Sequence, residues 1–318
     1  MRKAKEKWES NSIDVISNKL TDVWQNLKSL MKWNTKGPPT QLMHKGCVVR
    51  SPKQLATIMN DFFVDKIKTL EQKLPDPTGD PLEYLKKAMS NRKCVFSFRP
   101  VQPDEVKDIV LSLKNTGSAG VDEINTRVVK LVIDQILPAL THVINLSLST
   151  MAFPNLWKLA KVIPLFKKED PLLAKNYRPV SLLPILSKVL EKVVFKQVMS
   201  YLDQNELLHP SHHGSRADHS TTTAVIEMYE EWMEGIENGE MAAVMMIDLS
   251  AAFDLVNHNL LLKKLSVLGF DKNAVVWFWS YLTGRSQLVY VDGKMSDIKQ
   301  VPIGVPQGSV LGALLYTQ

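Results

Sequence analysis

Residues 241–248 limit the possible folds more than any other segment, because an apolar run there ends on a carboxylate. Every residue from Met241 to Ile247 is apolar, and Asp248 follows directly. A run of this length predicts a buried strand, and a carboxylate at its end is costly unless it is paired or binds a metal ion. Asp is also a good N-cap residue, so the start of a helix is an equal alternative for Asp248.

Size and composition indicate a folded chain without a membrane span. The chain has 318 residues, 45% of them hydrophobic and 23% charged, which is enough for two compact units with a large core. No apolar stretch approaches the roughly 18 residues of a membrane helix, and the N-terminus has no apolar segment of a secretory signal. The isolated Cys47 and Cys94 are typical of a reducing compartment and exclude a cysteine zinc site.

The charges are unevenly distributed along the chain. Residues 1–100 contain 19 Lys and Arg against 10 Asp and Glu, whereas the rest contains 20 against 23. A basic first third favours an acidic partner such as nucleic acid. A solubilising or flexible basic arm is the alternative.

Patterns of apolar residues predict the α+β fold class rather than a doubly wound sheet. Helical spacing predicts helices at 12–33, 51–70, 103–113, 124–150, 187–205, 221–239, 260–270 and 273–282. Strand-like stretches at 161–168 and 176–183 predict a hairpin, and 287–301 predicts another that turns at Asp292-Gly293. We expect a Gly-rich turn at 115–125 and a linker or an irregular wrap at 74–100.

Three motifs occur in an order that identifies a family. They are VIPLFKKEDPLLAKNYRPVSLLPILSKVLEKVV, IDLSAAFDLVNH and GVPQGSVLGALLY, starting at residues 162, 247 and 304. Together they resemble the reverse transcriptase of LINE-type (non-LTR) retrotransposons of the jockey-like group, over about residues 95–316. The resemblance implies a right-hand polymerase with fingers and palm. It divides the chain into a basic helical N-terminal region at 1–92, an N-terminal extension of the polymerase at 93–155, and fingers with a partial palm at 156–318.

The resemblance implies an RNA-directed DNA polymerase that uses an RNA template, a DNA primer and deoxynucleoside triphosphates. Two Mg²⁺ ions would lie between palm carboxylates and the triphosphate. Asp248 matches the first carboxylate, and the backbone carbonyl of Leu249 is placed to bind a metal. Phe253 matches the bulky residue that blocks a 2′-hydroxyl, with core packing as the alternative. Asp254 is assigned no chemistry, because it can cap the following helix.

Further residues of the motifs match nucleotide contacts in the family. Lys167, Lys168 and Arg178 on the first hairpin would meet the triphosphate. Outside this context, an exposed basic turn is the simpler explanation for them. Gln307 would contact the nucleotide near its sugar and base, and Gly308 would allow close approach to the base pair.

A histidine-rich segment, HHGSRADHSTTTA at 212–224, resembles another block of the family. Ser215 stands where an aromatic residue is usual, so Arg216 is given no role. Zinc binding is one interpretation of the cluster, but the absence of a nearby cysteine favours surface or RNA-facing histidines. The cluster comprises His209, His212, His213 and His219.

The family completes its metal site with an Asp-Asp pair on a hairpin that faces Asp248, and this sequence contains no Asp-Asp pair. Ala313 and Thr317-Gln318 also depart from the family pattern, and we expect a chain without the thumb and endonuclease segments of the family. We therefore expect a C-terminally truncated fragment without polymerase activity, because one Asp cannot hold two Mg²⁺ ions. Two alternatives stay open: a non-catalytic nucleic-acid-binding remnant, and a translation product that does not fold stably. Cellular location and oligomeric state are not predicted.

Overall fold

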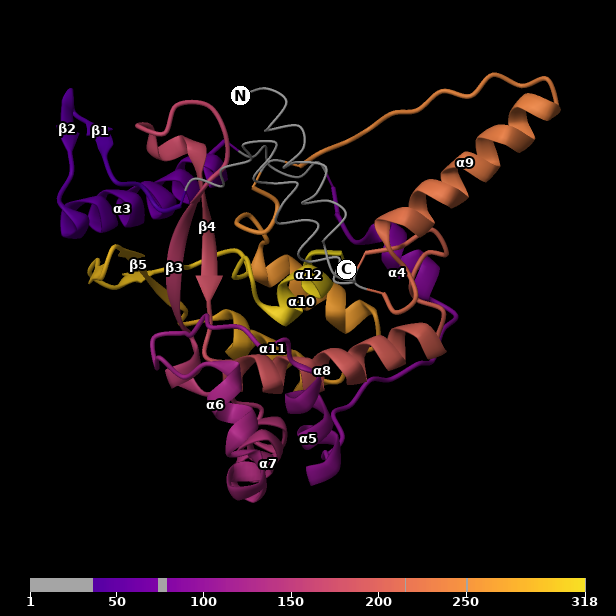
Figure 1. The fold of residues 1–318 in the computed structure, drawn as a ribbon. Coiled ribbons are helices and arrows are strands. Elements are labelled where there is room, and N and C mark those ends of the chain that lie inside the picture. Colours follow the sequence, from indigo (N-terminus) through magenta and orange to yellow (C-terminus); the bar gives the residue numbers. More distant parts are fainter. Residues whose placement is uncertain (1–36, 74–78, 215, 250, 318) are drawn as a thin grey trace, which may run out of the picture.

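The computed structural model describes residues 37–73, 79–214, 216–249 and 251–317 (Figure 1). The helix predicted at 12–33 lies outside these ranges. The helices are α3 (Pro52–Glu71), α4 (Glu83–Met89), α5 (Pro103–Ser112), α6 (Thr126–Leu131), α7 (Ile133–Ser149), α8 (Ile185–Gln204), α9 (Thr221–Glu237), α10 (His258–Val267), α11 (Lys272–Leu282) and α12 (Val310–Thr317). The strands are β1 (Leu42–His44), β2 (Cys47–Val49), β3 (Leu159–Phe166), β4 (Tyr177–Leu182), β5 (Ser286–Val291), β6 (Lys294–Met295) and β7 (Lys299–Gln300). No helix in these ranges is long and apolar enough to cross a bilayer.

One mixed sheet organises the strands that follow residue 158. Its order is β4-β3-β5-β6, and β7 also pairs with β5. β3 and β4 form the first predicted hairpin, whereas β5 runs parallel to β3. β5 and β6 form the second, and both turn residues, Asp292 and Gly293, have positive φ angles of 43° and 76°. Helices combined with this mixed sheet agree with the predicted α+β class.

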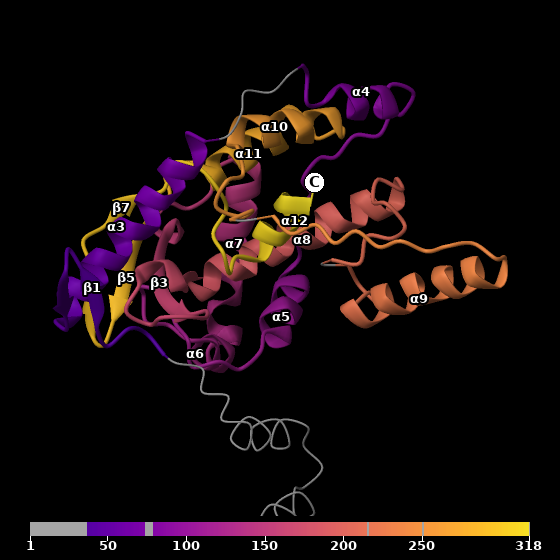
Figure 2. The same cartoon turned by 90° about the horizontal axis from the view of Figure 1, so that it is seen from above.

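Helix α3 covers one face of the sheet, as Figure 2 shows from above. It begins at Pro52, directly after Ser51, as the Ser-Pro pair predicts. Leu55, Met59 and Phe63 recur at helical spacing and pack with Val162 and Val289 of the sheet. These side chains are buried, and each contributes on the order of 1.5–3 kcal/mol by leaving water.

A larger core lies between the helices in the lower part of Figure 1. Its centre is α11, where Trp277 is fully buried and stacks on Tyr281 with an interplanar angle of 5°. The Trp277 Nε1 atom donates to Ser147 Oγ of α7 at 3.0 Å. Ile144 of α7 and Leu190 of α8 belong to the same cluster. Helices from the 93–155 range therefore share one core with helices from the 156–318 range.

Two predicted segments differ locally from the structure. The range 74–100, expected to be a linker or irregular, contains α4. The helix predicted at 124–150 is divided, because the backbone at Val132 leaves the helical region with φ −105° and ψ 12°. The apolar spacing continues across Val132, so the pattern alone does not reveal this break.

The buried strand predicted at 241–248 is wrong. Residues 241–249 are extended, but they pair with no strand in the described ranges, and Met241, Met246 and Ile247 are 100%, 86% and 78% exposed. A strand needs a neighbouring edge to satisfy its backbone groups, and none of the described strands lies alongside this segment. Figure 1 shows the segment returning from the far end of α9 toward the centre of the molecule.

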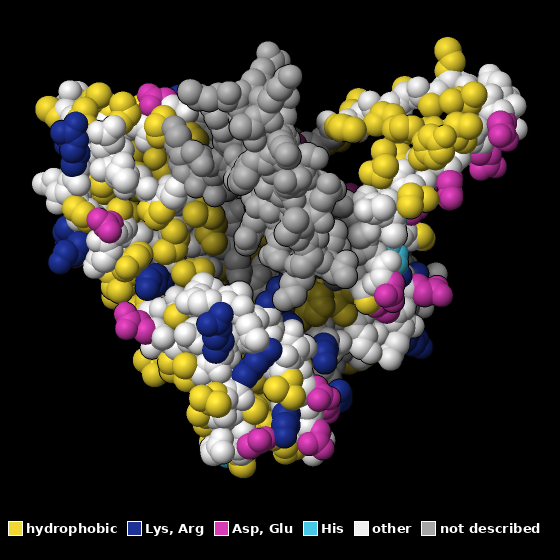
Figure 3. Space-filling model, viewed as in Figure 1, with side chains coloured by type: hydrophobic (Ala, Val, Ile, Leu, Met, Phe, Trp, Pro, Cys, Tyr) yellow, Lys and Arg dark blue, Asp and Glu magenta, His cyan; other side chains and the backbone are white. Residues whose placement is uncertain are grey.

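Helix α9 projects from the rest of the fold. None of its residues is buried, although its sequence has the apolar spacing that predicts a helix. Figure 3 shows apolar side chains gathered along it, and the exposed large ones are Val225, Ile226, Tyr229, Met233 and Ile236. The helix prediction for 221–239 is confirmed, whereas the packing that such spacing usually implies is absent from the described residues.

Candidate active site

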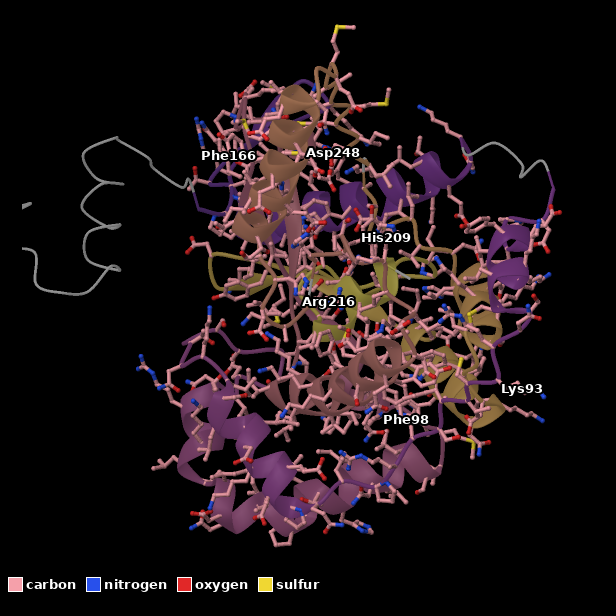
Figure 4. All side chains as sticks on the ribbon, turned by 90° about the vertical axis from the view of Figure 1, so that its right-hand side faces the viewer. Lys93, Phe98, Phe166, His209, Arg216 and Asp248 are labelled. Carbon is pink, nitrogen blue, oxygen red and sulfur yellow. The ribbon has the colours of Figure 1, made fainter. Side chains whose placement is uncertain are left out.

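An open cleft of about 690 Å³ collects most of the predicted site residues. It is lined by six of them: Lys167, Arg178, Asp248, Leu249, Phe253 and Gln307. They come from the first hairpin, from the segment that begins at 247, and from the turn before α12. Figure 4 shows Asp248 in the upper part of the molecule, where Phe166 at the end of β3 is also labelled.

The hairpin positions two cations on the same face of the sheet. Leu165 pairs with Arg178, and Lys167 N donates to Asn176 O at 2.8 Å, one step further along the ladder. Lys167 and Arg178 are therefore diagonal cross-strand neighbours, which lie close enough for long side chains to meet. Both are exposed and line the cleft, so it has a positive wall.

Lys168 and Gly308 do not line this cleft. Lys168 Nζ lies 3.4 Å from Glu169 Oε1 in an exposed pair. Gly308 has φ +117°, and a Cβ atom there would stand 2.7 Å from Ser181 O of β4. The neighbouring backbone is fixed to the same residue, since Ser181 N donates to Gln307 O at 2.9 Å. The close approach that needs glycine at 308 is thus made to β4.

The turn after Asp248 is pinned to the segment before α12. Val305 N donates to Phe253 O at 2.8 Å, and Gly304 N donates to Val256 O at 3.0 Å. The Phe253 ring lies against Tyr316, with a centroid distance of 5.1 Å. Phe253 is therefore held at the cleft by a turn and by an aromatic neighbour, rather than by the start of a helix.

Asp254 is a carboxylate of the cleft to which the sequence assigned no chemistry. Burial raises its pKa above the usual range, and the nearby Lys66 opposes that shift. Capping of the next helix is the wrong interpretation, because Asn257 Oδ1 accepts from Leu260 N at 3.0 Å as the cap of α10. Asp254 is thus a second, more buried carboxylate beside Asp248.

Sequence reasoning missed Glu191, whose carboxylate binds the backbone directly after the turn that carries Gln307. Its Oε2 atom accepts from Val310 N at 2.8 Å, Leu311 N at 3.2 Å and Tyr281 Oη at 3.3 Å, and Oε1 accepts from Ser187 Oγ at 3.0 Å. Glu191 is fully buried in α8 and holds the first turn of α12. The available signal was a single charge at a position that the apolar spacing of α8 assigns to the core.

The histidine-rich segment lies against α8 and α9. His213 Nε2 is 2.7 Å from Glu227 Oε2, and its Nδ1 is 2.9 Å from Thr223 Oγ1. Arg216 Nε lies 3.4 Å from Asp203 Oδ1 of α8, and Figure 4 labels Arg216 and His209 well below Asp248. No group of three or more metal-binding side chains occurs in the part of the chain that the structure describes. His213 therefore joins the histidine-rich segment to α9.

His258 joins the start of α10 to the segment before α12, and its burial gives a pH-dependent prediction. Its Nε2 atom lies 2.7 Å from Gly304 O, and burial lowers its pKa below the usual 6.5, with Arg285 acting in the same direction. The unfolded chain therefore binds a proton before the folded chain does. We expect the free energy of unfolding to decrease as the pH falls from 7.5 through 6.5, and to decrease less in His258→Gln.

Urea unfolding at pH 7.5 and 5.5 measures this difference. His44→Gln is the matched control, because His44 is exposed. An identical pH dependence in the wild type and His258→Gln would show that His258 does not titrate on unfolding.

Comparison with known proteins agrees with the motifs. Residues 166–318 match the family model for reverse transcriptase (RNA-dependent DNA polymerase), so this part of the chain belongs to the reverse transcriptase family. The RNA-directed DNA polymerase from mobile element jockey of Drosophila melanogaster is 34% identical over 215 residues, which are 67% of this chain and 23% of that protein. The probable RNA-directed DNA polymerase from transposon BS of the same species is 30% identical over 223 residues, 69% of this chain and 24% of that protein. The chain thus spans about a quarter of the length of the curated relatives it matches.

Proposed function

We propose that the cleft binds a deoxynucleoside triphosphate for RNA-directed DNA synthesis by a mobile element. The observation that supports this most is that Lys167 and Arg178 meet Asp248 in one cleft, although they come from separate motifs. Two cations and a carboxylate that can bind a metal ion suit a triphosphate, because a triphosphate is negatively charged and binds as its Mg²⁺ complex. Lys168 does not line the cleft, and in this proposal it would leave its exposed pair with Glu169 to contact the triphosphate.

The cleft offers part of a magnesium site. The Asp248 carboxylate and the Leu249 carbonyl are hard oxygen ligands of the kind that Mg²⁺ prefers. A bound ion would neutralise charge on the phosphoryl group that is transferred. Asp254 is less suited to this role, because its burial favours the protonated form. Asp248 therefore carries the metal chemistry of this chain.

Two further residues select the nucleotide. Phe253, fixed against Tyr316, would occupy the space of a 2′-hydroxyl and so favour deoxynucleotides. Gln307 would contact the sugar and base, from a turn anchored to β4. Gly308 keeps that anchoring turn close to β4, which makes it a positioning residue in this proposal.

The same residues imply that binding and synthesis are separable in this chain. Among the described residues, Asp248 and Asp254 are the carboxylates that line the cleft, and the sequence has no Asp-Asp pair. A single accessible carboxylate does not hold two Mg²⁺ ions in near-octahedral geometry. The chain would thus bind the nucleotide, and an RNA template with a DNA primer, without extending the primer.

A nucleotide-binding experiment tests the cleft. We expect Arg178→Gln to weaken Mg²⁺-dependent binding of a deoxynucleoside triphosphate roughly tenfold or more, because a charge-assisted phosphate contact is lost. Arg127→Gln on α6 is the matched control, since Arg127 is exposed and does not line the cleft. Calorimetry gives both affinities, and equal weakening in the two variants would count against the site.

Primer extension on an RNA template tests the second half of the proposal. With Mg²⁺ and deoxynucleotides, neither the wild type nor Asp248→Ala is expected to lengthen the primer. Extension by the wild type that disappears in Asp248→Ala would mean that other carboxylates complete the metal site, and the separation of binding from synthesis would be wrong.

A further inference from the structure

A second pocket contains buried positive charge that the nucleotide cleft does not use. It has a volume of about 50 Å³ and lies between α3 and the sheet, next to the turn that carries Gln307. Lys158 and Arg285 line it and are 7% and 4% exposed. Lys66, at its edge, also lines the nucleotide cleft.

The parallel pairing of β3 and β5 brings the two buried cations together. Leu159 pairs with Ser286, so Lys158 and Arg285 stand side by side one step earlier. Side chains alternate along strands, which places both on the same face as Ala160 and Gln287, and these two also line the pocket. The charges are thus adjacent, and proximity to Arg285 adds to the burial that lowers the pKa of Lys158.

Arg285 has hydrogen-bonding capacity that the described residues leave unused. Its Nε atom donates to Tyr281 O at 2.7 Å, but Nη1 and Nη2 are buried and have no partner in these ranges. The Tyr281 and Phe153 rings lie 4.2 Å and 5.4 Å from the guanidinium carbon. Aromatic rings stabilise the face of a guanidinium, whereas the in-plane N–H groups still need acceptors.

The charges that line the pocket are strongly unbalanced. Lys66, Lys158 and Arg285 face a single carboxylate, Asp254, whose burial favours its neutral form. Burying cations without anionic partners is costly, so an anion bound in the pocket would lower that cost. A tetrahedral oxyanion with more than one negative charge suits these groups, because Arg binds such oxygens with two parallel N–H groups and Lys adds a point charge.

We propose that this pocket binds a phosphate group through Lys158 and Arg285. The volume admits a single phosphate, as a few water-sized spaces fit within it. The group is either a free phosphate or pyrophosphate ion, or a phosphodiester of a nucleic-acid strand that continues from the neighbouring cleft. This site does not depend on nucleotide binding in that cleft, and its test uses no polymerase assay.

Thermal unfolding of the full chain tests the site, with sodium phosphate compared against sodium chloride of equal ionic strength. At a phosphate concentration ten times the dissociation constant, the wild type is expected to melt about 2 °C higher. Lys158→Met should lose this shift, yet melt no lower than the wild type without phosphate, because it removes a buried charge for which the described residues show no ion-pair partner. Lys294→Met, which changes an exposed lysine of β6, should keep the shift.

A second variant avoids any change in the core. Lys66 is exposed, so Lys66→Met is expected to fold normally and to weaken phosphate binding about threefold. The proposal is overturned if phosphate gives the wild type no shift beyond that of chloride. It is also overturned if both Lys158→Met and Lys66→Met keep the full shift.

Competition identifies the source of the phosphate group. If a strand supplies it, a single-stranded oligonucleotide displaces phosphate and binds roughly tenfold more weakly to Lys158→Met. If a free ion supplies it, pyrophosphate competes and the oligonucleotide binds both proteins equally. Either result, with the shift lost in Lys158→Met, supports a phosphate site in this pocket.

Discussion

Glu191→Ala is expected to lower the free energy of unfolding by about 3–5 kcal/mol. The change removes the acceptor of four hydrogen bonds inside the protein, so the Tyr281 hydroxyl and the N–H groups of Val310 and Leu311 lose their partner. The first turn of α12 then loses its fixed position, and Gln307 precedes it by only a few residues. Weaker nucleotide binding should accompany the lower stability.

Urea unfolding followed by circular dichroism measures the stability change, and calorimetry measures nucleotide affinity. Glu230→Ala on α9 is the control, because Glu230 is exposed and its loss should change stability by less than about 0.5 kcal/mol. Similar losses in both variants would mean that the network around Glu191 does not stabilise the fold. Unchanged nucleotide affinity in a folded Glu191→Ala protein would separate this residue from the cleft.

Trp277→Ala is expected to have the largest effect among the core residues, about 3–5 kcal/mol. Trp277 is fully buried, stacks on Tyr281, and donates a hydrogen bond to Ser147, so truncation creates a cavity and leaves a buried hydroxyl without its donor. Trp279, two positions along the same helix, is 55% exposed and provides an internal control. Trp279→Ala should cost far less.

Denaturant unfolding of both tryptophan variants distinguishes burial from a general effect on α11. A large loss only in Trp277→Ala would agree with a helix whose two faces differ in packing. Comparable losses would indicate that the face bearing Trp279 is also covered, which the present fold does not show.

Local signals in the sequence predicted most of the helices and both hairpins. Ser51-Pro52 places the start of α3, and Asp292-Gly293 places the turn between β5 and β6, because each pair has a backbone preference that few other conformations satisfy. The apolar spacing of α11 is equally informative, since this helix buries one side in the larger core.

Long-range packing explains what the sequence did not predict. The run before Asp248 has the composition of a buried strand, but composition does not supply the neighbouring edge that a strand needs. Lys158 and Arg285 are far apart in sequence, and only the parallel pairing of β3 with β5 makes them neighbours. Glu191 also depends on long-range packing, because three of its four partners come from α11 and α12.

The cleft likewise contains residues that the sequence predicted and one that it did not. The motifs predicted that Lys167, Arg178, Asp248 and Gln307 belong together, and the cleft brings them together. Their chemical roles stay predictions, which the binding and extension experiments address. Asp254 does not cap the following helix, because Asn257, a residue type that starts helices equally well, occupies the cap position.

The packing of α3 on the sheet has a consequence for synthesis on the ribosome. Asn60 of α3 donates to Ser296, across 236 positions of sequence. At 5–20 residues per second, a ribosome needs roughly 10–50 s to make that intervening stretch. Until β5 is made, the apolar side of α3 has only the β3–β4 part of its sheet to cover, so the nascent chain should be a substrate for chaperones during that time.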